Sequence, residues 1–163
     1  MQIDDEPKVS IDDIDVLLID ALQDNARASY RDLGAQVGLT PPAVAARLKR
    51  LEQTGVITGY TVKISPAALG HPILSLVRIK SIGQQKADEF DKRVADIPEI
   101  VECRRVTGTD SHVARAYLRS TSHLEEVLDQ FWQYGETITN IVTSSPVPRR
   151  SLRVRNLAQY RVQ

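Results

Sequence analysis

The sequence predicts an α+β protein built from two small domains, three helices followed by a βαββαβ unit. Residues 11–54 repeat apolar side chains at helical spacing, whereas residues 73–148 alternate strand patterns with two amphipathic helices. The pattern changes near residues 68–72. A length of 163 residues, 42% hydrophobic and 26% charged, suits two small globular domains better than one.

Composition excludes several classes of protein. No uninterrupted apolar run reaches the ~18 residues of a transmembrane helix, and the acidic start at residues 4–6 is unlike a secretory signal. The single Cys103 rules out an internal disulfide or a Cys-rich zinc cluster, and His71, His112 and His123 lack metal-ligand spacing. We therefore expect a cytoplasmic protein with no metal, cofactor or membrane partner.

The formal net charge of zero hides an uneven distribution of charged side chains. Residues 1–26 carry eight acidic and one basic side chain, whereas residues 27–64 carry six basic and two acidic ones. Residues 65–148 are close to balance, and residues 149–163 carry five arginines and no acid. Two basic segments therefore lie within a neutral chain, which keeps a nucleic-acid partner open.

The first helix is predicted from about residue 11 to residue 22. Ser10 or Asp12 can cap its start, and its buried stripe leaves three aspartates mostly outside, namely Asp13, Asp15 and Asp20.

Two further helices follow the first. One spans residues 30–37 with Ser29 as its cap and Gly38 at the turn, and the other runs from the Thr40 cap and Pro41 to about residue 54. Residues 56–58 and 60–64 then read as the two strands of a hairpin turning at Gly59.

The second domain reads as strands at residues 73–79, 100–106, 113–118 and 137–145, with two helices between them. In the first of these helices the apolar residues recur at helical spacing, at Ala87, Phe90, Val94 and Ile97, and Pro98 ends it. The second begins at Ser122, where Glu125 completes a capping box, and stops at Gly135. Phe131 and Trp132 are most simply core residues against the sheet, although a sheet-pairing dimer could also use them. This order is the ferredoxin-like plan.

The most informative segment is residues 31–44. Leu33, Val37, Leu39, Val44 and Leu48 form a small core, while Gly34 lets two helices cross and Gly38 makes the bend, as in a helix-turn-helix that places its second helix in the DNA major groove. The alternative is a helical hairpin that binds nothing. The expected DNA-contacting residues lie opposite the buried stripe and on the hairpin: Pro42, Ala43, Ala46, Arg47, Lys49, Arg50, Tyr60 and Lys63, with Thr58 beside them.

These motifs resemble one known family over residues 10–148. The segments that carry the likeness are Asp12…Asp15…Leu17-Leu18, Arg31-Asp32-Leu33 to Thr40-Pro41, Arg47-Leu48-Lys49-Arg50-Leu51-Glu52…Gly55-Val56-Ile57, Ile64-Ser65-Pro66…Leu69-Gly70 and Val106-Thr107-Gly108-Thr109-Asp110. In this order and spacing they look like the Lrp/AsnC, or feast/famine, transcription regulators.

The resemblance implies a winged helix-turn-helix joined by a hinge strand to a ferredoxin-like regulatory domain. It also implies sheet-paired homodimers that assemble into octamers, and an amino-acid effector bound between regulatory domains. The chain departs from the family at Gly34, where the family usually has Ala, at Thr40 and at Ser111-His112. We expect Gly34 to cost about 1 kcal/mol of helix propensity and to leave the helix crossing undisturbed.

The effector site is expected in the loop at Thr107, Gly108, Thr109, Asp110 and Ser111. Backbone N–H groups of a glycine-containing loop can hold a carboxylate, and Asp110 offers the charge that an α-ammonium needs. The alternative is a turn in which Asp110 caps its own backbone.

We interpret the chain as a non-enzymatic, nucleoid-associated regulator that binds a roughly palindromic operator in double-stranded DNA. Its predicted parts are a flexible tail (1–10), the DNA-binding domain (11–64), a linker (65–72), the regulatory domain (73–148) and a basic arm (149–163). We expect Arg47→Ala with Arg50→Ala to abolish operator binding without unfolding.

Two rival functions stay open. One is an architectural DNA-binding protein without an effector, and the other is a small enzyme that uses Cys103 or His112. Cys103 itself reads as a small buried apolar residue and His112 as a strand-edge or interface residue. The arm's arginines, Arg149, Arg150, Arg153, Arg155 and Arg161, allow a disordered tail, a DNA-backbone contact or a strand that serves assembly, and the alternation with Leu152 and Val154 favours the last.

Overall fold

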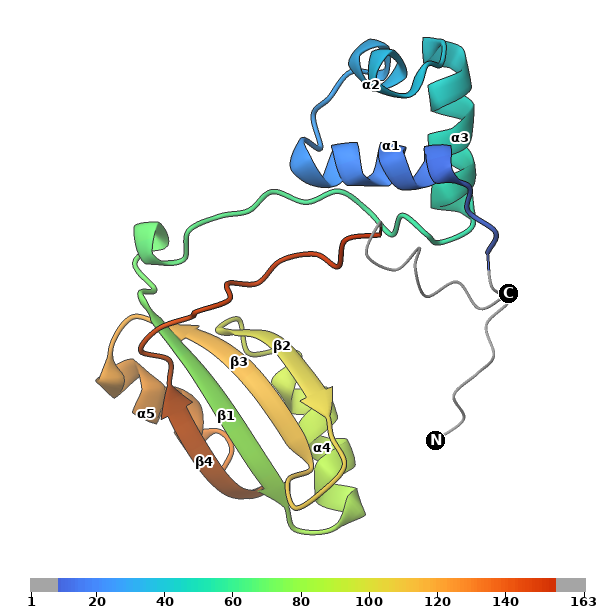
Figure 1. Cartoon of the computed structure of the whole chain (residues 1–163). Helices are drawn as coiled ribbons and strands as arrows, with labels where there is room; N and C mark the ends of the chain where they lie inside the picture. The colour runs from blue at the N-terminus through green and yellow to red at the C-terminus, as the bar shows by residue number, and fades with distance from the viewer. Residues whose placement is uncertain (1–8, 155–163) are drawn as a thin grey trace. The chain divides into compact units, whose positions relative to one another are not determined.

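The computed structural model describes residues 9–154, which form two compact units. The N-terminal unit comprises residues 9–62 with residues 149–154, and the C-terminal unit comprises residues 63–148. Three helices build the N-terminal unit: α1 (Asp13–Asp24), α2 (Tyr30–Val37) and α3 (Pro41–Gln53) (Figure 1). Within the described range, no helix has the length and apolar character needed to cross a membrane.

The residues at the cap positions explain where α2 and α3 begin and where α2 ends. The Ser29 side chain accepts a hydrogen bond from the backbone of Asp32 and caps α2, and Gly38 ends that helix with a φ of 71°. Thr40 occupies the cap position of α3 without a side-chain hydrogen bond. The helices enclose a common core of Leu18, Ile19, Leu33, Val44, Leu48 and Leu51. The apolar spacing predicts all of these except Ile19.

The expectation that Asp15 and Asp20 lie outside is wrong. Asp15 is fully buried and Asp20 is 7% exposed. Asp12 caps α1 and Asp15 completes a capping box with it, each side chain accepting a hydrogen bond from the other's backbone N–H. The carboxylate of Asp15 is thus drawn toward the helix start, where α3 supplies its other partners.

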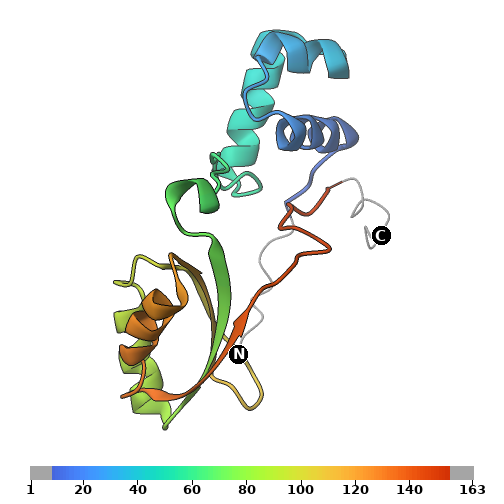
Figure 2. The same cartoon turned by 90° about the vertical axis from the view of Figure 1, so that its left-hand side faces the viewer.

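The C-terminal unit has the βαββαβ order. After the short turn η1 (Ala67–Leu69) come β1 (Ile73–Ser81), α4 (Gln84–Val94), β2 (Ile100–Arg105), β3 (His112–Leu118), α5 (Thr121–Asp129) and β4 (Gly135–Ile141). The sheet order is β2-β3-β1-β4 with antiparallel pairing throughout. Figure 2 shows α4 and α5 on the same face of this sheet.

The core of this unit lies between the sheet and its two helices. Phe90 is fully buried at its centre, with ring centroids 5.2 Å from Phe131 and 5.6 Å from Tyr134. Trp132 was expected in this core and instead is 76% exposed, because it follows the end of α5 and points its indole N–H to Asp129.

Three expected boundaries in this unit also differ. Ser120, not Ser122, caps α5 by accepting a hydrogen bond from the backbone of His123, so the predicted capping box does not form. Gly135 is the first residue of β4 rather than a helix stop, and β4 ends at Ile141 instead of continuing to residue 145.

The expected hairpin after α3 is absent, since residues 56–65 contain no strand in the described structure. Val62 and Ile64 are 82% and 67% exposed, so the alternation that suggested a strand buries no apolar face here. A two-stranded hairpin without a covered face is marginal in water. The segment is therefore extended chain, linked to α3 by the Ile57 N–H, which donates to the Leu51 carbonyl at 3.0 Å.

The described part of the arginine arm forms no edge strand, contrary to the expectation. Leu152 and Arg153 contact α1: the Gln23 side chain donates to the Leu152 carbonyl at 2.9 Å, and Arg153 forms an ion pair with Asp24. Val154 is partly buried against the core of the N-terminal unit. Arg155 and Arg161 lie outside the described residues.

Gly34 lies within α2 with the turn to α3 packed against it, which agrees with the expectation that a small residue here lets the two helices cross closely. A Cβ at this position would lie 2.3 Å from the Leu39 carbonyl oxygen, which is far inside contact distance. We expect Gly34→Ala to lower stability, because an overpacking cost of about 1–3 kcal/mol outweighs a helix-propensity gain of about 1 kcal/mol. Thermal unfolding measures the change, with Gln36→Ala as an exposed control on α2; a raised midpoint would contradict the expectation.

Candidate DNA interface and effector loop

Helix α3 presents a surface of small side chains beside its buried stripe. Val44, Leu48 and Leu51 face the core, whereas Pro42, Ala46 and Lys49 are exposed and Ala43 is half-buried. Pro42, Ala43 and Ala46 are small enough to allow a ligand to approach the helix backbone closely, and Lys49 adds a positive charge beside them. The exposed part of α3 therefore has the form needed to enter a groove.

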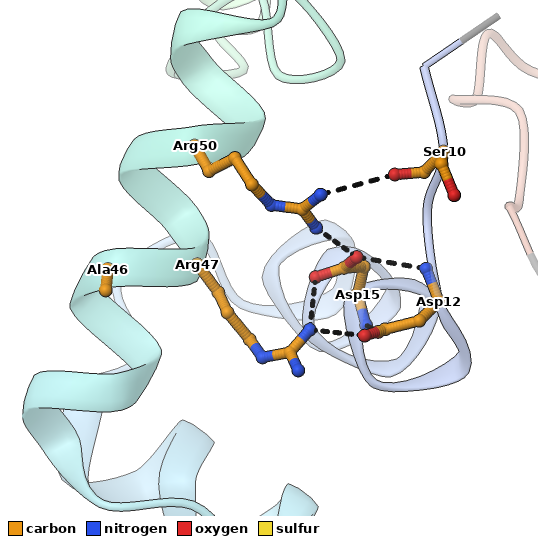
Figure 3. Close-up of a pocket in the computed structure, with 6 residues that line it drawn as sticks. All are labelled: Ser10, Asp12, Asp15, Ala46, Arg47 and Arg50. Carbon is orange, nitrogen blue, oxygen red and sulfur yellow. Dashed lines mark hydrogen bonds and ion pairs between the residues drawn. The ribbon is translucent and has the colours of Figure 1, made fainter.

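Arg47 and Arg50 do not simply point away from the protein, because both guanidinium groups are held at the start of α1. The Arg47 Nη1 atom donates to Asp12 Oδ2 at 2.6 Å and to Asp15 Oδ1 at 3.0 Å. Arg50 Nη2 donates to Asp15 Oδ2, and its Nη1 donates to the Ser10 carbonyl at 3.3 Å. We call these four side chains, Asp12, Asp15, Arg47 and Arg50, the arginine clamp (Figure 3).

The electrostatics of the arginine clamp favour the charged forms. The hydrogen bond from Arg47, aided by the Asp15 backbone N–H, holds the pKa of the Asp12 carboxyl below its ordinary value. Hydrogen bonds to Asp12 and Asp15 raise the pKa of Arg47 in turn. The clamp lines an open hollow of about 420 Å³ together with Ser10 and Ala46. Sequence reasoning missed these partners, although the Asp12-x-x-Asp15 spacing signalled the capping box.

The remaining predicted DNA contacts are scattered. The Tyr60 hydroxyl donates to Glu52 Oε1 at 2.9 Å and thereby ties the extended segment to α3. Partial burial of the hydroxyl, and secondly its hydrogen bond to Glu52, raises the pKa of Tyr60 to about 12. Thr58 is exposed in the N-terminal unit, and Lys63 is exposed at the start of the C-terminal unit. Without the hairpin, no wing gathers these three residues.

The loop at residues 107–111 connects β2 to β3 in the C-terminal unit. Thr107, Gly108 and Thr109 are exposed, and Gly108 has a φ of 118°, a region that favours glycine. The Val106 N–H donates to the Ser111 carbonyl at 3.0 Å and closes the loop.

Asp110 and Ser111 connect this loop to β1. An Asp110 oxygen lies 3.6 Å from Arg78 Nη1, so a carboxylate and a guanidinium stand together at the loop. The Ser111 hydroxyl donates to the Ile79 carbonyl at 2.8 Å and accepts from the Ser81 N–H at 3.0 Å. Arg78 was missed from the sequence, because it is some thirty residues upstream and only strand pairing brings it near.

His112 is 1% exposed, so the expectation of a strand-edge residue is wrong. Its Nδ1 lies 2.9 Å from Ser111 Oγ, and its Nε2 lies 2.8 Å from Asp91 Oδ1. Burial acts to raise the pKa of Asp91, but hydrogen bonds from Arg105 and His112 outweigh it and lower that pKa. The imidazole therefore joins the loop to α4.

Cys103 borders the same region, in an open hollow of about 370 Å³. Burial raises the pKa of its thiol to about 11, which disfavours the reactive thiolate. No group of His, Cys, Asp and Glu side chains in the described part of the chain is arranged to hold a metal ion.

Two family models match the chain, one over the three helices and one over the sheet and the four residues that follow the C-terminal unit. Residues 11–52 match the AsnC-type helix-turn-helix domain, which includes α1, α2 and most of α3. Residues 74–152 match the Lrp/AsnC ligand binding domain, which includes the sheet and the loop between β2 and β3.

Known proteins resemble the chain along most of its length. The HTH-type transcriptional regulator LrpA of Mycobacterium tuberculosis is 33% identical over 138 residues, which are 85% of this chain and 89% of that protein. The structure of AsnC from E. coli is similar with a TM-score of 0.81 at 27% identity, over 88% of this chain and 99% of AsnC. A feast or famine regulatory protein from M. tuberculosis, complexed with L-methionine, has a TM-score of 0.81 at 30% identity, with 88% and 99% coverage.

Proposed function

The chain belongs to the Lrp/AsnC family of transcription regulators, and from that premise we propose that α3 binds an operator and that the loop at residues 107–111 binds an amino acid. The DNA contact would be made by the outward edges of Arg47 and Arg50 with Pro42, Ala43 and Ala46, and Lys49, Tyr60 and Lys63 would lie nearer the DNA backbone. A homodimer places two copies of α3 on one duplex, so the operator should be roughly palindromic.

The pairing of Asp110 with Arg78 is the observation that carries the effector proposal. A free amino acid is a zwitterion, and this pair offers it both complementary charges at 3.6 Å beside a glycine-containing loop. The α-carboxylate would meet Arg78 and loop N–H groups, and the α-ammonium would meet Asp110. The relative complexed with L-methionine supports this class of ligand.

We expect one or more of the twenty amino acids to raise the thermal midpoint of the regulatory domain, because a ligand that binds only the folded state stabilises it. At a ligand concentration of about 100 times Kd, the gain is about 2.7 kcal/mol. The screen uses the full chain in differential scanning fluorimetry and includes L-methionine.

Asp110→Asn should abolish that shift, whereas Glu125→Gln, on an exposed face of α5, should keep it. A wild type that no amino acid stabilises would overturn the effector proposal and favour an architectural DNA-binding protein. If an amino acid still raises the thermal midpoint of Asp110→Asn, the ligand binds elsewhere than at this loop.

The assembly proposal starts from the face of the sheet that α4 and α5 leave uncovered. Leu76, Val113 and Tyr117 are half-buried there and Ile138 is 51% exposed, which is more apolar surface than a solvated sheet face needs. Pairing of two such faces would give a homodimer, and dimers would assemble into an octamer.

The remaining parts of the proposal follow from this function. We retain the division into residues 1–10, 11–64, 65–72, 73–148 and 149–163, and a cytoplasmic, nucleoid-associated location. The relatives are transcription regulators, and the raised pKa of Cys103 gives a thiol-based reaction no support, so we propose no catalysis.

A further inference from the structure

The arginine clamp leaves one edge of Arg47 available, and this edge is the basis of a further inference. Both N–H groups of Nη1 are used, one on Asp12 and one on Asp15. Nε and Nη2 have no hydrogen-bond partner among residues 9–154. Figure 3 shows this Nε–Nη2 edge turned away from the two carboxylates.

A guanidinium held by two carboxylates donates its remaining hydrogen bonds in a fixed direction. Its Nε–H and Nη2–H bonds lie in one plane and match a pair of acceptor atoms, such as O6 and N7 of a guanine or two oxygens of one phosphate. Ordering a free arginine side chain costs up to about 2 kcal/mol of rotamer entropy. The carboxylates have already restricted Arg47 in the unbound protein, so little of that cost falls on binding.

Arg50 is held differently from Arg47. It uses Nη1 on the Ser10 carbonyl and Nη2 on Asp15, so both of its terminal nitrogens are engaged. Its side chain is 45% exposed, against 29% for Arg47, yet it has less free edge for a planar acceptor pair. The two arginines, one helical turn apart, are therefore not equivalent.

We propose that Asp12 is a positioning residue that holds Arg47 with its Nε–Nη2 edge toward a planar pair of acceptors on DNA. The inference rests on the proposed binding of DNA by α3. The competing role is a brake, in which Asp12 competes with DNA for Arg47. The two roles predict opposite changes when Asp12 is replaced.

Asp12→Ser separates the clamp from the helix cap. Serine ranks with aspartate as an N-cap and can still accept from the Asp15 N–H, which lies 2.8 Å from the Asp12 oxygen. It is too short and uncharged to hold Arg47. Asp12→Asn is the second variant, since it keeps the cap and the length and removes only the charge. Glu125→Gln in the C-terminal unit removes the same charge far along the chain.

The experiment uses the full chain and a duplex selected by the wild type from a random library, with a scrambled duplex for non-specific binding. For Asp12→Ser we expect about a tenfold loss of affinity for the selected duplex and an unchanged thermal midpoint. Binding of the scrambled duplex should stay unchanged if Arg47 contacts a base, and it should weaken in parallel if Arg47 contacts a phosphate. Asp12→Asn should lose less affinity for the selected duplex than Asp12→Ser, and Glu125→Gln should lose none. Relaxed preference at one guanine would identify a base contact, and a salt slope lowered by about one would identify a phosphate contact.

Three results would overturn the proposal. Unchanged or tighter binding of the selected duplex by Asp12→Ser would contradict positioning, and tighter binding would indicate the brake. A parallel loss on both duplexes together with a lower midpoint would make Asp12 only a structural cap. A wild type that does not distinguish the selected from the scrambled duplex would remove the proposed function itself, and with it this inference.

Discussion

Replacing both Arg47 and Arg50 with alanine is expected to unfold the N-terminal unit under conditions where the C-terminal unit stays folded. The substitutions leave the carboxylate of Asp15, which is fully buried, without its two cationic partners. Removing the partner of a buried charge costs about 3–5 kcal/mol. Small domains have only about 5–15 kcal/mol of stability in total, so this loss is large.

Hydrogen exchange read by mass spectrometry locates the effect, because peptides from residues 13–53 should lose protection while those from residues 73–141 keep it. Arg31→Ala with Lys49→Ala removes the same charge from exposed positions and serves as the control. Adding Asp15→Leu to the double variant should recover part of the stability, since no stranded carboxylate remains. A double variant as stable as the control would show that the clamp contributes nothing.

This outcome changes how Arg47 and Arg50 must be tested for DNA binding. From the sequence alone, their double substitution was expected to abolish binding without unfolding. The helical spacing placed both residues away from the Val44 and Leu48 stripe, and that placement holds. What the spacing could not show is the partner, because Asp12 and Asp15 are more than thirty residues away and meet α3 only in the folded unit.

Local signals predicted the elements well, and contacts distant in sequence were predicted poorly. The βαββαβ order, the Ser29 cap and the Gly38 turn all follow from neighbouring residues and are confirmed. The prediction of a hairpin at residues 56–64 was wrong. Alternating apolar residues show only that a segment can form a strand, whereas a stable strand pair also needs its apolar face covered.

The proposed effector loop shows the same limit. Residues 107–111 were identified by a glycine and an aspartate between two strands. Arg78, its cationic partner, depends on the register of β1 against β3, in which Arg78 pairs with Val113. His112 was placed at a strand edge because one sequence does not show that α4 covers that face, where Asp91 accepts its N–H.

Phe90→Ala is expected to destabilise the C-terminal unit by about 3–5 kcal/mol, which is the usual cost of emptying a buried phenylalanine site. Phe90 is fully buried, and its ring makes edge contacts with His112, Phe131 and Tyr134 at centroid separations of 5.0, 5.2 and 5.6 Å. Calorimetry of the full chain measures the change. Phe90→Leu is the matched control, since it keeps most of the apolar volume and should lose much less.

The two large effects should be independent, because Phe90 and the arginine clamp lie in different units, whose cores share no described residue. Distant sites add within about 0.5 kcal/mol, so a chain that combines Phe90→Ala with Arg47→Ala and Arg50→Ala should show the sum of the separate losses. A larger or smaller combined loss would mean that the units stabilise one another. The difference from the sum is the coupling free energy between the units, and an effector at residues 107–111 would need such coupling to act on α3 within one subunit. Strict additivity would instead assign regulation to assembly between subunits.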